Sequence, residues 1–238
     1  MPNAQKMNLI AIIENFSTKT WIIFSLISNV FLFLLSISLY VFIDKSCRKN
    51  KLQPLDHPIN RSDIYLSILT VSLNCLLMLL AVYLWKQGFL NWKTHHSVIT
   101  TSLETLAIIF IMDFLMYVFH YVAHTPIIYK LLHRKHHEHN STNYLSLFVL
   151  HPFETVGFGL MMIVVFSSYS FSVYALSLYI IINLIWGTLG HLNREFFPKW
   201  ADYSFLGTTK FHNQHHQYES RNFGFYTSIW DRLFGTYK

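Results

Sequence analysis

The sequence predicts an all-α integral membrane protein with about four transmembrane helices, a helical hairpin among them, and a cytoplasmic helical cap. Of its 238 residues, 53% are hydrophobic and only 13% are charged, whereas about a quarter of residues are charged in soluble domains. Several apolar runs are long enough to cross the ~30 Å hydrocarbon core as helices. Basic residues gather between these runs, which is typical of membrane topology and argues against a nucleic-acid partner.

The apolar runs define the expected elements in chain order. Residues 1–100 are expected to form N-terminal membrane-anchoring helices, with either a short interfacial helix or irregular chain over residues 8–16. Residues 101–238 are expected to form the part of the protein that carries its chemistry. The expected spans are 20–43, 64–85 and 98–122, followed by a hairpin over 153–189 with a polar break at 167–170.

The third expected span differs from the first two because it contains Glu104, Asp113 and His120. Ionisable groups inside a span are costly and usually face the bundle interior or a polar cavity. The third span is therefore the first candidate for a functional element.

Lysines and arginines predict the topology. Fourteen of the 18 fall in the first loop, the segment after the third span and the C-terminal region, and four fall in the N-terminus and the second loop. The excess of positive charge marks the cytoplasmic side. These three segments are therefore expected to meet on the cytoplasmic face, since the hairpin returns to the side from which it starts.

The histidines are clustered: 11 of 14 lie between His120 and His216. They form the patterns HYVAH from His120, HRKHH from His133 and HNQHH from His212. Residues three and four apart share one face of a helix, and neutral imidazole is a ligand for iron, zinc, copper and nickel. One HxxxH pair is expected by chance in such a chain, but two HxxHH patterns are not. The three boxes therefore predict a metal site.

Eight box histidines exceed the needs of one zinc ion, which takes about four ligands, and they suffice for two metals roughly 3.5–4 Å apart. The two cysteines, Cys47 and Cys75, exclude a cysteine zinc site. A dinuclear iron site would activate O2, and apolar surroundings suit an acyl or sterol substrate. Two alternatives stay open: a histidine-rich metal transporter or sensor, with ligands along a path across the bilayer, and a structural metalloprotein.

The remaining histidines have weaker assignments. His57, His95 and His96 are expected to be interfacial anchors or hydrogen-bond partners rather than ligands. His139 and His151 lie close enough to the boxes to be ligands, neighbours of ligands or neither, and the sequence does not decide between these roles.

Over residues 105–238 the chain resembles the fatty acid hydroxylase/sterol desaturase superfamily of membrane di-iron enzymes. The order and spacing of HYVAH, HRKHH and HNQHH carry the resemblance. Further similar elements are His151-Pro-Phe-Glu154, Gly190-His191, Asn222-Phe-Gly224 and the segment from Trp230-Asp231 to Thr236. Some hydroxylases have another histidine four residues before the isolated one, where this chain has Gly187, which implies an open or water-filled position on one iron.

The resemblance implies nine iron ligands: His120, His124, His133, His136, His137, His191, His212, His215 and His216. Ligating imidazoles usually donate their other N–H to a carboxylate or carbonyl. The candidates for such supporting contacts are Asp113, Glu154, Asn222 and Asp231. Glu154 has a second interpretation as a helix cap, and Asp231 has one as a surface partner of Arg221 or Arg232.

The resemblance also implies a reaction in which O2 and two external electrons oxidise an unactivated C–H bond of a lipid from the bilayer, by hydroxylation or desaturation. No flavin, haem or nicotinamide motif is visible, so electrons are expected from a cytochrome b5 or ferredoxin-type partner. Lys130, Arg134, Lys135, Arg194 and Lys199 could dock an acidic donor. Sterol, fatty acyl, sphingolipid and carotenoid substrates stay open. The compact length and the lack of a C-terminal dilysine favour a bacterial inner membrane over the endoplasmic reticulum.

Overall fold

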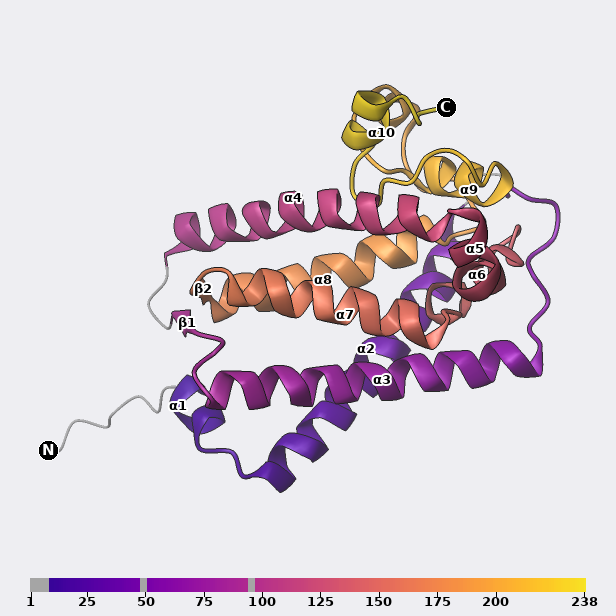
Figure 1. The fold of residues 1–238 in the computed structure, drawn as a ribbon. Helices are drawn as coiled ribbons and strands as arrows, with labels where there is room; N and C mark the ends of the chain where they lie inside the picture. Colours follow the sequence, from indigo (N-terminus) through magenta and orange to yellow (C-terminus); the bar gives the residue numbers. More distant parts are fainter. Residues whose placement is uncertain (1–8, 48–50, 94–96) are drawn as a thin grey trace, which may run out of the picture.

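The computed structural model describes residues 9–47, 51–93 and 97–238 (Figure 1). Four helices are long and apolar enough to cross a membrane: α2 (Thr18–Ser46), α3 (Arg61–Lys86), α4 (Val98–Ala123) and α8 (Val173–Gly190). A shorter apolar helix, α7 (Pro152–Ser167), forms the other arm of a hairpin with α8. The predicted helical membrane fold, including its hairpin, is confirmed.

Local sequence signals explain where the helices begin. The side chain of Asn60 accepts a hydrogen bond from the Asp63 backbone and the Asp63 carboxylate accepts one from the Asn60 backbone, which forms a capping box at the start of α3. Ser97 and Thr100 form the same motif at the start of α4. A short helix, α1 (Leu9–Glu14), lies within the expected interfacial segment; residue 8 of that segment lies outside the described residues.

A short strand that the sequence did not predict directly follows the polar break of the hairpin. Strand β2 (Phe171–Ser172) pairs in parallel with β1 (Trp92–Lys93), which precedes α4. The Glu104 carboxylate accepts a hydrogen bond of 2.6 Å from the Ser172 backbone and lies 3.6 Å from the Lys93 ammonium. Glu104, an acidic residue of the third span, therefore links the turn of the hairpin to α4.

The five apolar helices form one bundle. Helix α3 packs against α2 and α7, α4 packs against α7 and α8, and α2 packs against α8. A buried core between α4 and the hairpin includes Ile108, Met112, Val165 and Tyr179. Large apolar side chains such as Phe31 are exposed on the outside of the bundle. Burial on one face and apolar exposure on the other fit helices that are surrounded by lipid.

Short helices cover one end of the bundle, where α4 and α8 end and α3 and α7 begin (Figure 1). The elements of this cap are α5 (Pro126–Ile128), a π-helix (Tyr129–His133), α6 (Arg134–His137), 3-10 helices at Ser146–Phe148 and Lys199–Tyr203, and α9 (Thr209–Gln217). Helix α10 (Ile229–Phe234) packs against the side of α4, where Trp230 contacts Phe110 and Phe114. The first loop also reaches this end, since a bridge joins Lys51 to Arg194 and the Gln53 backbone bonds the Asn193 side chain at 2.8 Å. The three basic segments of the sequence therefore meet at one end of the molecule.

Asp113 attaches the C-terminal region to α4. Its buried carboxylate accepts hydrogen bonds from the backbone of Tyr226 at 2.8 Å and of Thr227 at 3.2 Å, from the Thr227 hydroxyl, and from the Trp230 indole at 3.0 Å. One side chain of the third span thus satisfies four donors of a segment more than 100 residues away.

Replacing Asp113 with alanine is expected to lower the unfolding free energy by about 3–5 kcal/mol, because it leaves several buried donors unpaired. In detergent this corresponds to a fall in Tm of roughly 10 °C. The matched control is Asp202→Ala, which removes a surface carboxylate paired with Lys210 and should change stability by less than about 1 kcal/mol. Equal effects of the two substitutions would contradict the anchoring role of Asp113.

Candidate metal centre

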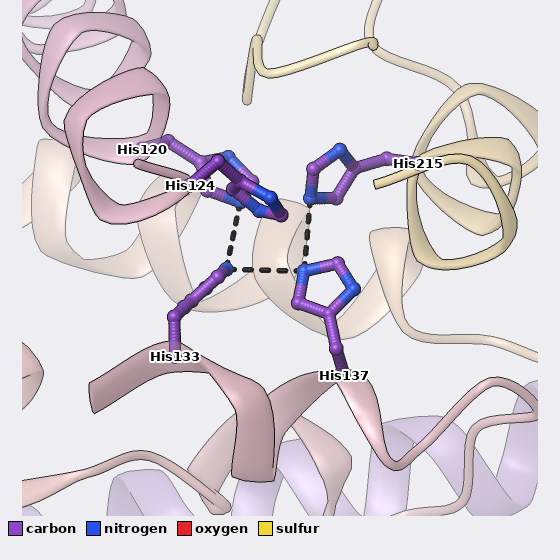
Figure 2. A group of neighbouring side chains, drawn as sticks. All are labelled: His120, His124, His133, His137 and His215. Atoms are coloured by element: carbon purple, nitrogen blue, oxygen red, sulfur yellow. Dashed lines mark hydrogen bonds between the residues drawn. The ribbon is translucent and has the colours of Figure 1, made fainter. Parts of the chain in front are cut away.

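Nine buried or half-buried histidines converge at the capped end of the bundle, in two groups. The first group, shown in Figure 2, comprises His120, His124, His133, His137 and His215. The second comprises His136, His191, His212 and His216. Within each group the potential ligand atoms all lie within 4.8 Å of one another. The structure thus brings together all nine histidines that the resemblance singled out.

Each HxxHH box divides its histidines between the two groups. His133 and His137 belong to the first group and His136 to the second; His212 and His216 belong to the second and His215 to the first. An α-helix turns 100° per residue, so positions i and i+4 are about 40° apart while position i+3 lies on the other side of i. The five-residue box can therefore supply two ligands to one site and one ligand to its neighbour.

Hydrogen bonds define which ring nitrogen carries the proton in five of these histidines. Four Nδ1 atoms donate to backbone carbonyls and that of His133 donates to the Glu154 carboxylate. The carbonyl pairs are His120 with Phe223 at 2.9 Å, His136 with Val149 at 3.3 Å, His191 with Gly187 at 2.8 Å and His215 with Arg221 at 2.6 Å. Since a carbonyl oxygen only accepts, the Nε2 atoms of these neutral rings carry bare lone pairs.

These bare Nε2 atoms point at one another. The Nε2 atoms of His120 and His133 are 3.1 Å apart, and those of His136 and His191 are 3.4 Å apart. Two lone pairs cannot form a hydrogen bond, whereas two imidazoles bound to one ion at about 2.0–2.1 Å have nitrogens roughly 3.0–3.4 Å apart. The buried Nε2 of His124 also has no hydrogen-bond partner among the described residues. The donor set of both groups therefore fits a bound metal ion.

Burial keeps these rings neutral. Desolvation, and secondarily the neighbouring histidines, lowers the pKa of His136, His212, His215 and His216 well below the ordinary value. Burial also lowers the pKa of His191 to about 4. Neutral imidazole is the form that binds metal ions, so the centre presents lone pairs at neutral pH.

Of the four expected supporting residues, Glu154 contacts a histidine directly. Its second oxygen accepts a hydrogen bond of 3.1 Å from the His151 backbone, so Glu154 caps α7 and orients His133 at the same time. Asp231 accepts from the backbone of Phe223 at 2.8 Å and of Gly224 at 2.7 Å. It thereby holds the segment whose Phe223 carbonyl orients His120.

Asn222 and Asp113 also bind the C-terminal segment rather than an imidazole. Asn222 has a left-handed backbone with φ of 59°, and its side chain accepts from the Lys238 backbone at 2.8 Å. Asp113 binds Tyr226, Thr227 and Trp230, as described above. Among the described residues, backbone carbonyls therefore take most of the contacts that were expected from carboxylates. The sequence carries no signal for them because every residue has a carbonyl.

Gly187 occupies the place of the additional histidine found in some relatives. Its carbonyl orients His191, and a Cβ atom at this position would lie 2.8 Å from the Leu147 side chain. The second group consequently has four histidines, one fewer than the first. A side chain at this position would require the Leu147 side chain to shift.

A largely apolar cavity of about 390 Å³ reaches the centre from within the helical bundle. His120, His133, His136, His191 and His212 line it, so it contacts both groups. Its other walls come from α2, α3, α4, α7 and α8, and include Phe33, Leu77, Met116, Phe158 and Met162. The sequence could not assign these lining residues because they come from five helices.

The other histidines in the described part of the chain lie apart from the two groups. His151 caps α7, with its Nδ1 accepting from the Phe153 backbone at 3.3 Å. His139 bonds Ser146 and stacks on His57, with ring centroids 3.9 Å apart. His57 was expected to be an interfacial anchor or a hydrogen-bond partner, and the sequence did not predict its ring contact with His139. His95 and His96 lie outside the described residues.

Changing Glu154 to glutamine is expected to weaken metal binding about 10–100-fold, because the His133 ring loses the carboxylate that fixes its orientation. The amide still caps α7. Metal retained after dialysis against a graded series of chelator concentrations measures the effect. Asp202→Asn, which changes a surface carboxylate paired with Lys210, is the control. Unchanged retention in Glu154→Gln would contradict the role of this carboxylate.

The metal-free protein is expected to lose stability as the pH falls below about 6.5. Histidines of an unfolded chain titrate near pH 6.5, whereas folded His191 takes up its proton only near pH 4. Between these values the unfolded chain binds more protons, so the unfolding free energy rises with pH and levels off above the window. The chelator-treated protein should therefore have a lower Tm near pH 5.5 than near pH 7.5, and equal values would contradict neutral, buried rings.

Comparisons with known proteins agree with this geometry. The chain is 27% identical over 158 residues to a Delta(7)-sterol 5(6)-desaturase of Candida glabrata, covering 62% of this chain and 39% of the relative. It is 28% identical to human lathosterol oxidase, covering 56% of this chain and 44% of the relative. It is 30% identical to a very-long-chain aldehyde decarbonylase of Oryza sativa subsp. indica, covering 61% and 24%. The chain thus spans less than half the length of these relatives.

No solved structure matches the chain. The family model for fatty acid hydroxylase matches residues 105–236, which is more than half of the chain and includes all nine clustered histidines. The protein therefore belongs to the fatty acid hydroxylase family, within the fatty acid hydroxylase/sterol desaturase superfamily.

Proposed function

We propose that this protein is an O2-dependent di-iron oxidoreductase that hydroxylates or desaturates a lipid, either a sterol or a fatty acyl chain, at the membrane. The observation that carries the proposal is the apolar cavity, whose end is lined by histidines of both groups. A hydrocarbon chain or ring system can enter such a cavity from the bilayer. The relatives named above are enzymes named for sterol or long-chain aldehyde substrates, which supports a lipid substrate for this chain.

Two irons would be held by the two histidine groups. His120, His124, His133, His137 and His215 would bind the first, and His136, His191, His212 and His216 the second. Iron bound in this way supplies the capacity to reduce O2 and to remove hydrogen from an unactivated C–H bond. The second site, with four histidines, leaves more room for a water or substrate oxygen than the first.

The residues of the chain bind the lipid, orient the imidazoles and exclude water from the cavity. The apolar walls of the cavity, such as Phe33 and Phe158, bind the hydrocarbon part of the lipid and keep water from the reacting carbon. Glu154 and the carbonyls of residues 149, 187, 221 and 223 hold the imidazoles in one tautomer. This preorganisation avoids reorienting the ligands during the reaction.

The overall stoichiometry requires an external reductant. Hydroxylation consumes R–H, O2, two electrons and two protons and yields R–OH and one water. Desaturation consumes the same co-reactants, removes two hydrogens from adjacent carbons, and yields an alkene and two waters. A cytochrome b5 or ferredoxin-type protein is the proposed donor of the electrons.

The proposed docking face is the capped end of the bundle, which we place on the cytoplasmic side because the basic segments gather there. Lys130, Arg134 and Lys199 are exposed at this end. Lys135 and Arg194 are half-buried in ion pairs with Glu138 and Asp44, which makes them weaker candidates for contacts with an acidic donor than the exposed three.

A metal transporter is the second candidate, and the placement of ligands disfavours it. All three groups of potential metal ligands in the described residues lie at the capped end. Glu104, an acidic residue of the third span that could have extended such a path, bonds Ser172 and Lys93 instead. We therefore retain the oxidoreductase as the proposed function.

Comparative lipidomics tests this proposal. Cells with the active protein should contain a hydroxylated or desaturated lipid that is absent with His136→Ala or His215→Ala, since each variant removes a ring from one group. The purified protein should hold two irons in the two groups and consume O2 when supplied with its lipid and a reduced donor. His151→Asn, which keeps the helix cap, is the control and should retain activity. One zinc per chain with no change in lipids would contradict the proposal.

A further inference from the structure

A third group of potential metal ligands lies outside the dinuclear centre: His57, Asp63 and His139. His57 belongs to the loop before α3, Asp63 to the first turn of α3, and His139 to the segment that follows α6. Their potential ligand atoms all lie within 4.8 Å of one another. The group combines two imidazoles with a carboxylate, which is a common ligand set for divalent transition metals.

Two members of this group are fully buried, and one of them has an unused ring nitrogen. The exposed fractions of Asp63 and His139 are both 0%. Within the described residues, the Nε2 of His139 has no hydrogen-bond partner, and it faces the Asp63 Oδ1 at 3.4 Å. Hydrogen bonds between nitrogen and oxygen are usually 2.7–3.2 Å long. By contrast, two ligands of a tetrahedral ion with bonds of about 2.0–2.1 Å lie about 3.3–3.4 Å apart.

Each of the three residues is also held by a second contact. The Nδ1 of His139 bonds the Ser146 hydroxyl at 2.8 Å, which leaves its Nε2 for a metal ion. The Asp63 Oδ2 accepts from the Asn60 backbone at 3.1 Å, while Oδ1, which is nearer His139, accepts a long hydrogen bond of 3.4 Å from the Ser62 hydroxyl. The backbone carbonyl of His57 accepts from the Asn143 side chain at 3.0 Å, which fixes the loop. Outer contacts to the imidazole and the carboxylate are typical of residues that bind metal ions.

We propose that His57, Asp63 and His139 form a separate mononuclear site for a divalent transition metal, best matched by Zn²⁺. Three protein ligands leave one tetrahedral position for water. Imidazole and carboxylate bind Zn²⁺ more tightly than Fe²⁺ or Mn²⁺. The His57 and His139 rings are stacked, with planes inclined by 24°, so the half-buried His57 ring has to rotate about its side-chain bonds to direct a lone pair at the same ion.

The Lys135 ammonium lies beside this site and competes with a metal ion for the Asp63 carboxylate. Its ammonium lies 3.6 Å from the Asp63 Oδ1 and 2.8 Å from the Glu138 Oε2. When a cation binds, like-charge repulsion moves the ammonium towards Glu138, which is exposed and remains as its partner. Lys135 is half-buried on a long flexible side chain, so this displacement costs little.

An ion bound at this site would cross-link two segments that are distant in the sequence. It joins the first loop and the start of α3 to the segment that directly follows the second histidine box, more than 70 residues away. The same loop is bonded through Gln53 to Asn193 and Asn213, next to His191 and His212. A metal ion here therefore fixes the loop beside the second histidine group without belonging to that group.

Elemental analysis of the full chain tests the proposal. Iron-loaded protein is equilibrated with Zn²⁺, passed over a desalting column and analysed for total transition metal per chain. Wild type should hold three ions, His57→Ala should hold two, and the matched control His151→Asn should hold three. Asp63→Asn, which keeps an acceptor for the Asn60 backbone, should bind Zn²⁺ at the third site at least about tenfold more weakly.

The outcomes separate this site from the proposed di-iron function. Two ions in wild type, or three in His57→Ala, would overturn the third site and leave the di-iron proposal standing. One ion in wild type, bound as Zn²⁺ and lost in His57→Ala, would support the third site while contradicting the dinuclear centre. A Tm measurement on each variant establishes that the loss of an ion does not reflect unfolding.

Discussion

The rest of the structure depends on one constraint: unprotonated imidazole nitrogens face one another at short distances. In pairs such as His120 with His133, the Nε2 atoms lie 3.1 Å apart although neither carries a proton to share. Without a cation such contacts are repulsive, and burial makes them more so because the dielectric is low. A positive ion between the rings turns repulsion into attraction. The capped end of the bundle thus provides a site for a positive ion that the polypeptide does not itself supply.

The C-terminal region maintains this arrangement from outside the membrane spans. Asp231 bonds the backbone of Phe223 and Gly224, and the Phe223 carbonyl in turn orients His120 on α4. Asp113 on the same helix binds the following residues, including Tyr226. Contacts therefore run in both directions between α4 and the C-terminal segment. Because each side positions the other, removing either carboxylate would change the positions of the histidines, although neither carboxylate contacts an imidazole.

Besides anchoring the protein, the membrane helices form walls of the cavity beside the histidine groups. Phe33 on α2 and Leu77 on α3 line the same cavity as His136 and His191, and the first loop reaches the second histidine group, where Gln53 bonds Asn193 and Asn213. Helices α2 and α3 consequently form one structural unit with the histidine-bearing region. This arrangement joins an apolar cavity between the helices to the histidine groups at the end of the bundle, as the proposed reaction on a lipid requires.

The sequence by itself determined the membrane helices and the residues of the histidine clusters. A run of about 20 apolar residues has one stable solution in lipid, a helix with its backbone hydrogen bonds satisfied internally, and the spacing of each box follows the helical repeat. The tertiary structure alone decided how His133, His136 and His137 divide between two groups. It also decided that Glu154 reaches His133 and that His57 meets His139, because these contacts depend on how helices distant in sequence pack, which no local pattern of residues encodes.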